Sequence, residues 1–215
     1  MKILPVFLGL MLSLVVHGQD MVKSDSSWYM PMSKKVDSID NSTSLTVELL
    51  LALNRADNRY FHLVGELMKG AKVCHMRGQL FLTYPNKAIE IRKDGVILHK
   101  GFEGTCDEPV ESMIYGTNRK YIEQDDGNMQ ISYAIDDVEH QTTLGELTVH
   151  VRQMKCEDTG TNPVTLVHDG QQLKLKAVVS LQFFEFDYNE DGSNELYLFS
   201  FAMCQERMKL YRVYD

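Results

Sequence analysis

The chain has 215 residues, and 22 Lys and Arg against 30 Asp and Glu give it a formal net charge of −8 at pH 7. Hydrophobic residues make up 44% of the sequence and charged residues 24%, which is typical of a globular protein with a buried core. This composition excludes a largely disordered chain and a collagen-like chain. The acidic charge argues against nucleic acid as a partner, because phosphate backbones repel an acidic surface.

Residues 1–18 have the features of a secretory signal peptide. Lys2 supplies the positive start, residues 3–16 form an apolar run, and residues 16–18 precede the expected cleavage point. The run is shorter than the roughly 20 residues that cross a membrane, so we expect cleavage and no stable membrane insertion afterwards. The sequence therefore predicts a secreted or periplasmic protein.

Residues 19–44 are polar and predict a linker or a loosely held arm. Residues 28–32 are an exception, because they form an apolar cluster that contains Trp28, the single tryptophan. An apolar cluster of this kind either docks on the parent domain or binds a partner, and we favour docking.

Residues 45–215 predict a domain that is all-β or nearly so. Expected extended segments are 45–53, 60–68, 73–83, 88–91, 96–98, 129–135, 147–151, 173–186, 195–201 and 208–213. Turns of the Asp-Gly type fall between them at residues 94–95, 126–127, 169–170 and 191–192, and Asp-Gly between extended runs is a strong hairpin signal. We expect one β-sandwich or barrel of roughly ten strands, with two subdomains divided near residues 104–128 as the alternative.

The sequence contains four cysteines, all beyond the signal peptide: Cys74, Cys106, Cys156 and Cys204. An even number of cysteines in an exported chain predicts up to two disulfides. Three pairings are possible, and we favour Cys74–Cys106 with Cys156–Cys204 because each closes a loop within one half of the chain. No two cysteines have the two-residue spacing that zinc sites prefer.

Residues 187–195 place oxygen-bearing side chains at alternate positions, in the pattern of a loop that curls around a hard cation. Ca²⁺ takes about six to eight oxygen ligands, and Gly192 supplies the sharp turn that such a loop needs. The predicted ligands of a structural Ca²⁺ are Asp187, Asn189, Asp191, Ser193 through its backbone carbonyl, and Glu195.

These nine residues resemble the calcium loops of dockerins, EF-hands and integrin-type propeller repeats. The likeness is closest to the strand–loop–strand version, because the flanking residues 183–186 and 196–199 have strand character. Leu198 also occupies the place where an EF-hand carries its bidentate glutamate. The block 183–214 resembles the last segment of small secreted bacterial proteins of unassigned function, which implies no activity.

The sequence has no recognisable nucleophile motif, zinc-protease motif or phosphate-binding loop. Acidic residues at 107–111 and at Asp136–Asp137 leave a small glycosidase-like hydrolase as the alternative function. We expect instead a non-catalytic binding or structural protein with a structural Ca²⁺, whose partner is another envelope protein or a glycan.

Overall fold

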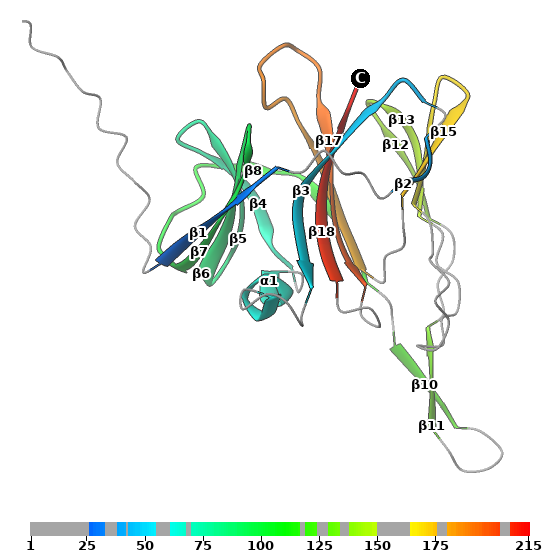
Figure 1. Ribbon diagram of the computed structural model, residues 1–215. Coiled ribbons are helices and arrows are strands. Elements are labelled where there is room, and N and C mark those ends of the chain that lie inside the picture. The colour runs from blue at the N-terminus through cyan, green and yellow to red at the C-terminus, as the bar shows by residue number, and fades with distance from the viewer. Residues whose placement is uncertain are drawn as a thin grey trace, which may run out of the picture.

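The computed structural model describes residues 26–32, 38–41, 43–54, 61–67, 70–116, 119–123, 129–133, 138–149, 164–175, 180–202 and 207–215. These residues form eighteen strands and one short helix, and the strands of three antiparallel sheets lie in three layers (Figure 1). The prediction of an all-β fold is confirmed. The fold is a sandwich rather than a barrel, and it has more strands than the roughly ten expected.

Sheet A is one outer layer. In spatial order it contains β1 (Ser26–Pro31), β7 (Gly95–Phe102), β6 (Asn86–Arg92), β5 (Gln79–Tyr84), β4 (Lys72–Met76) and β8 (Glu108–Val110). Strands β4 to β7 are joined by tight hairpins. The Asp-Gly turn predicted at residues 94–95 connects β6 to β7, and a turn at Arg77–Gly78, both with positive φ, divides the segment 73–83 that we expected to be continuous.

Sheet B is the central layer. In spatial order it contains β3 (Thr46–Asn54), β18 (Arg207–Tyr214), β17 (Glu195–Ala202), β16 (Ser180–Phe186) and β9 (Ser112–Gly116). Sheet B therefore combines the early strand β3 and the middle strand β9 with the last three described strands.

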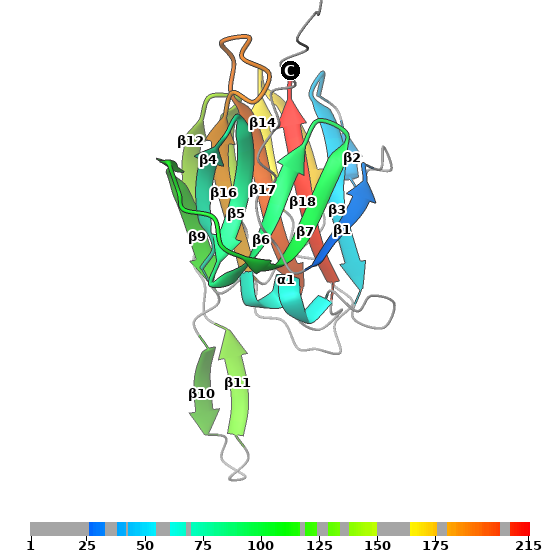
Figure 2. The same cartoon turned by 90° about the vertical axis from the view of Figure 1, so that its left-hand side faces the viewer.

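Sheet C is the other outer layer. In spatial order it contains β12 (Val138–Thr142), β13 (Gly145–Val149), β14 (Val164–His168), β15 (Gln171–Leu175) and β2 (Ser38–Asn41). The predicted Asp-Gly turn at residues 169–170 connects β14 to β15. Strands β10 (Arg119–Glu123) and β11 (Met129–Tyr133) form a separate hairpin that extends beyond the sheets (Figures 1 and 2).

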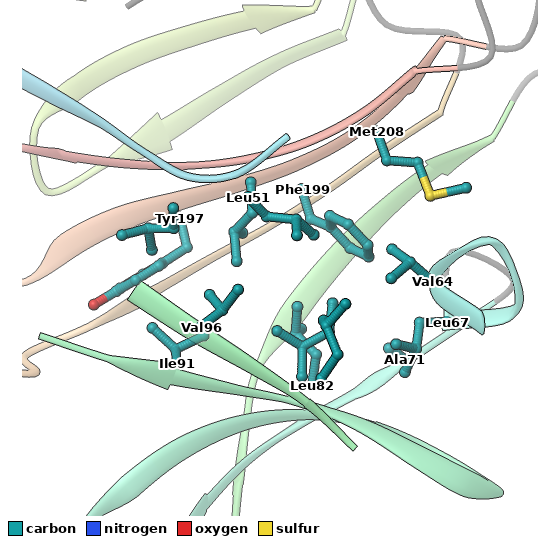
Figure 3. Packing of buried hydrophobic residues seen from close by; sticks show 14 of the residues in the cluster. Leu51, Val64, Leu67, Ala71, Leu82, Ile91, Val96, Tyr197, Phe199 and Met208 are labelled. Atoms are coloured by element: carbon teal, nitrogen blue, oxygen red, sulfur yellow. The ribbon is translucent and has the colours of Figure 1, made fainter. Parts of the chain in front are cut away.

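Two hydrophobic cores lie on the two faces of sheet B. The first, between sheets A and B, includes Leu51, Leu82, Ile91, Val96 and Phe199 (Figure 3). The second, between sheets B and C, combines alternate residues of β3, β16, β17 and β18 with residues of β13, β14 and β15. A strand buried on both faces needs apolar side chains at successive positions, which explains the unbroken apolar run at residues 196–199.

The single described helix, α1 (Phe61–Leu67), corrects the prediction of a strand at residues 60–68. Phe61, Val64 and Leu67 are buried at three-residue spacing, so one face of the helix packs into the first core. Figure 3 shows Val64 and Leu67 facing Met208 and Ala71 at one end of this core.

Parts of the predicted arm are edge strands of the outer sheets. β1 pairs with β7, with Trp28 opposite Leu98, and β2 pairs with β15. Met32 packs against the first core. The backbone of the 28–32 cluster therefore lies on the parent domain, as the docking alternative predicts.

The predicted disulfide Cys74–Cys106 is present, with a Cα–Cα distance of 5.5 Å. It fastens the segment that follows β7 onto the outer face of sheet A, where Cys74 packs with Phe81 and Phe102. Cys156 and Cys204 lie outside the described residues.

Candidate metal centre

The candidate site is the loop of residues 187–194, which joins β16 to β17. Phe186 and Glu195 are paired across the ladder, so the two ends of the loop are fixed beside each other. Within the loop, Glu190 and Gly192 have positive φ values of 59° and 91°. Positive φ values at two alternate positions, Glu190 and Gly192, bend the backbone sharply within the loop.

Asp187 closes the loop through backbone hydrogen bonds. Its carboxylate accepts the N–H of Asp191 at 3.1 Å and the N–H of Gly192 at 2.9 Å, one on each oxygen. These two hydrogen bonds hold Asp187, the first predicted ligand, against the backbone of Asp191, the third predicted ligand.

Asn189 and Asp191 continue the same network. The Asn189 Oδ1 accepts the N–H of Asp191 at 3.0 Å, and its Nδ2 donates to the Asp191 Oδ2 at 2.8 Å. The other Asp191 oxygen accepts the N–H of Ser193 at 2.8 Å. The structure therefore brings Asp187, Asn189 and Asp191 together in one network.

Glu195 reaches the loop from its base. This side chain is 5% exposed, and its Oε2 accepts the N–H of Tyr188 at 2.8 Å. Ser193 takes part in the network through its backbone N–H. All five predicted site residues are thus engaged in the hydrogen bonds of this one loop, although no hydrogen bond joins Glu195 to the three residues of the inner network.

The loop is strongly acidic. Residues 187–195 include four carboxylates and no lysine or arginine. Among the described residues, no three His, Cys, Asp or Glu side chains are placed to hold a metal by themselves. A cation here would therefore need the Asn189 amide and backbone carbonyls in addition to the carboxylates, and this is the mixed oxygen set that Ca²⁺ accepts.

The loop is also tied to both outer sheets. Tyr188 packs against the first core and donates its hydroxyl to the Gln79 Oε1 in sheet A at 3.1 Å, and burial raises its pKa. Just before the loop, the Glu185 Oε1 accepts the N–H of Thr143, in the β12–β13 turn of sheet C, at 2.6 Å. The end of β16 and the loop that follows it therefore contact both outer sheets.

The carboxylates considered for a hydrolase are not gathered into a buried site. Asp107, Glu108 and Glu111 are exposed, and Glu108 lies 3.0 Å from the His75 Nδ1. Asp136 and Asp137 lie outside the described residues. Exposed carboxylates lack the desolvation that tunes a catalytic acid.

Two buried clusters of charged residues were not predicted from the sequence. On the outer face of sheet A, the Glu90 carboxylate is 2.7 Å from the His99 Nε2 and 2.6 Å from the Arg92 Nε. Burial raises the pKa of Glu90, but the hydrogen bonds from His99 and Arg92 lower it more, so the net pKa lies below its usual value. Glu90 lies between Ile89 and Ile91 in the sequence. This alternation is the only sequence pattern that indicates the buried cluster.

The second buried cluster connects sheets A and B. The Arg212 Nε donates to the Glu48 Oε2 at 2.8 Å, and the Arg212 Nη2 donates to the same oxygen and to the Lys93 carbonyl at 3.3 Å. Tyr214 donates to the other Glu48 oxygen at 3.1 Å. Glu48 and Arg212 lie 164 residues apart, so no local pattern could have paired them.

Comparisons with known proteins give no assignment. No family model, curated protein or solved structure matches the chain. No helix among the described residues is long and apolar enough to span a bilayer.

Proposed function

We propose that this is an exported, non-catalytic binding or structural protein whose loop 187–195 holds a structural Ca²⁺. The observation that carries the calcium proposal is the hydrogen-bond network of Asp187, Asn189 and Asp191. Each carboxylate oxygen in that network accepts one backbone or amide donor, and a carboxylate oxygen has a further lone pair to offer a cation.

Electrostatics favour a divalent ion at this place. Four carboxylates within nine residues repel one another, and the loop has no basic residue to offset them. A bound Ca²⁺ would relieve this repulsion and would have a structural role, not a catalytic one. Because Tyr188 and Glu185 connect the loop region to both outer sheets, the ion would stabilise the packing of all three layers.

Export is supported by the disulfide Cys74–Cys106, since disulfides persist in oxidising compartments. A protein partner is favoured over a glycan. Glycan binding needs an exposed aromatic platform, and Tyr29 is the one large exposed aromatic among the residues whose side-chain exposure the structure describes. The carboxylates of residues 107–111 are solvent-exposed, which favours binding over hydrolysis.

Thermal unfolding with and without Ca²⁺ tests the proposal. For a dissociation constant of about 10⁻³ M, addition of about 10 mM Ca²⁺ stabilises the fold by about 1.4 kcal/mol, or roughly 3–6 °C in Tm. The double variant Asp187→Asn plus Asp191→Asn removes two charges and keeps one acceptor oxygen at each position, so we expect it to lose the calcium response.

Asp169→Asn is the matched control, because Asp169 is an exposed residue in the Asp-Gly turn of another hairpin. It should respond to Ca²⁺ as the wild type does. A wild-type Tm that does not change with Ca²⁺, or a full response in the double variant, would refute a calcium site at this loop.

A further inference from the structure

In the part of the chain that the structure describes, no strand pairs with the free edge of β9, the outer strand of sheet B. β9 pairs with β16 on one side, and Figure 2 shows it at the margin of the central layer. An edge strand presents unpaired N–H and C=O groups, and proteins usually block such edges with charges, proline or bulges.

Each of the other five edge strands of the three large sheets has such a block. The block is a proline or an acidic residue in four of them: Pro31 in β1, Pro109 in β8, Asp40 in β2 and Glu139 in β12, and in β3 it is an irregular register with β18. The pairings of β2 and β3 also contain register irregularities. β9 has the sequence Ser-Met-Ile-Tyr-Gly, with no charge and no proline, and its pairing with β16 is regular.

The same edge is apolar and exposed. Met113 is 37% exposed and Ile114 is 50% exposed, and Tyr29 is the only other exposed large hydrophobic residue among those whose side-chain exposure the structure describes. Adjacent strand residues point to opposite faces, so Met113 and Ile114 expose apolar surface on both faces of the edge. Unpaired backbone and apolar side chains together favour the addition of another strand.

We propose that β9 pairs antiparallel with β9 of a second copy of this chain, about a two-fold axis at Ile114. In this register Ile114 faces its own copy, and Met113 faces Tyr115 of the partner subunit. No charged residue lies within β9, so a copy meets no like charge along the strand. The inference deepens the proposed binding function by naming its partner, and it does not depend on calcium.

The charges that flank β9 favour a copy in antiparallel orientation. Glu108 and Glu111 precede the strand and are exposed, whereas Arg119 and Lys120 follow it. An antiparallel pair brings the acidic flank of one copy toward the basic flank of the other, and a parallel pair would bring like charges together. A two-fold axis forms both of these contacts at once.

The dimer should be weak. A stable protein interface buries about 1,200–2,000 Å², and one five-residue strand pair contributes less than that. Association should therefore depend on concentration, and sedimentation velocity of the full chain from about 10 μM to about 1 mM covers the relevant range.

Ile114→Lys is the test variant, and Tyr29→Lys is its control on another edge strand. We expect the wild type and Tyr29→Lys to dimerise, and Ile114→Lys to raise the dimer dissociation constant about tenfold or more. Ile114 is half exposed, so its variant should unfold at the wild-type temperature. A wild type that stays monomeric, or an Ile114→Lys variant that associates like the wild type, overturns the proposal.

Cross-linking checks the register independently. Directly opposed residues have Cβ atoms about 4.5–5.5 Å apart, which is close to the reach of a disulfide. Ile114→Cys should give a disulfide-linked dimer on a non-reducing gel, and Tyr29→Cys should not. Cross-linking by Tyr29→Cys and none by Ile114→Cys would contradict the β9 pairing.

Discussion

The disulfide Cys74–Cys106 gives a prediction whose size follows from the structure. It closes a loop with a sequence separation of 32 residues that contains the second half of β4 and the whole of β5, β6 and β7. For a loop of this length, the chain-entropy relation predicts about 3.7 kcal/mol of stabilisation at 25 °C. This stabilisation arises because the unfolded chain has fewer conformations when the loop is closed.

The double variant Cys74→Ala plus Cys106→Ala tests this reasoning without disturbing other cysteines. Urea unfolding should show a free energy of unfolding lower by about 4 kcal/mol, with a larger m-value because the unfolded chain is less constrained. Thr105→Ala, at an exposed position beside Cys106, should change stability by less than about 0.5 kcal/mol. An unfolding free energy within about 1 kcal/mol of the wild type would refute the entropic account.

Three further predictions concern buried or strained positions. Glu48→Ala leaves the buried Arg212 without its carboxylate and should cost about 3–5 kcal/mol in urea unfolding. The pKa of Glu90 is lower in the folded protein than its unfolded value of 4.5, so the ionised carboxylate stabilises the fold above pH 4.5. This stabilisation is lost as the pH falls through the folded pKa, and the Tm of Glu90→Gln should therefore decline less at acid pH than the Tm of the wild type. Gly145 has a φ of +127°, and Gly145→Ala places a Cβ 2.0 Å from a carbonyl oxygen of β14. We expect this variant to lower the free energy of unfolding by about 1–3 kcal/mol or more. Gly170→Ala places its Cβ in open space and should lower it less in the same assay.

Local patterns in the sequence were sufficient to predict two hairpins of the outer sheets. Asp94-Gly95 and Asp169-Gly170 both lie at the turns expected of them, because their backbone conformations are set within a few residues. The turn at Arg77–Gly78 was missed, since an arginine at positive φ has no reliable sequence signal. Asp126-Gly127 lies outside the described residues.

The three-layer arrangement was not predicted, although the sequence contains a sign of it. Residues 49–51 and 196–199 are continuously apolar, which fits strands covered on both faces better than the half-exposed strands of a two-layer sandwich. Residues 45–53 were predicted to be extended, but not to be covered on both faces. Helix α1 was misassigned because a seven-residue segment is too short for its periodicity to be distinctive.

The predicted metal residues illustrate what a sequence motif can supply. Asp187, Asn189 and Asp191 were expected to share a loop, and they do, because the whole motif is local. The contacts from Tyr188 to Gln79 and from Glu185 to Thr143 join segments that are distant in the sequence. Only the folded topology could reveal that this loop region touches both outer sheets.

The order of strands in the middle layer has a consequence for how the protein is made. β3 belongs to the first quarter of the chain, yet its neighbour β18 is the last strand, and β16 and β17 lie just before it. Sheets A and C each pack against these strands, so neither can cover its apolar face until residues 180–214 have been made. The apolar faces of sheets A and C must therefore be shielded from aggregation until β16, β17 and β18 are present to complete the interior.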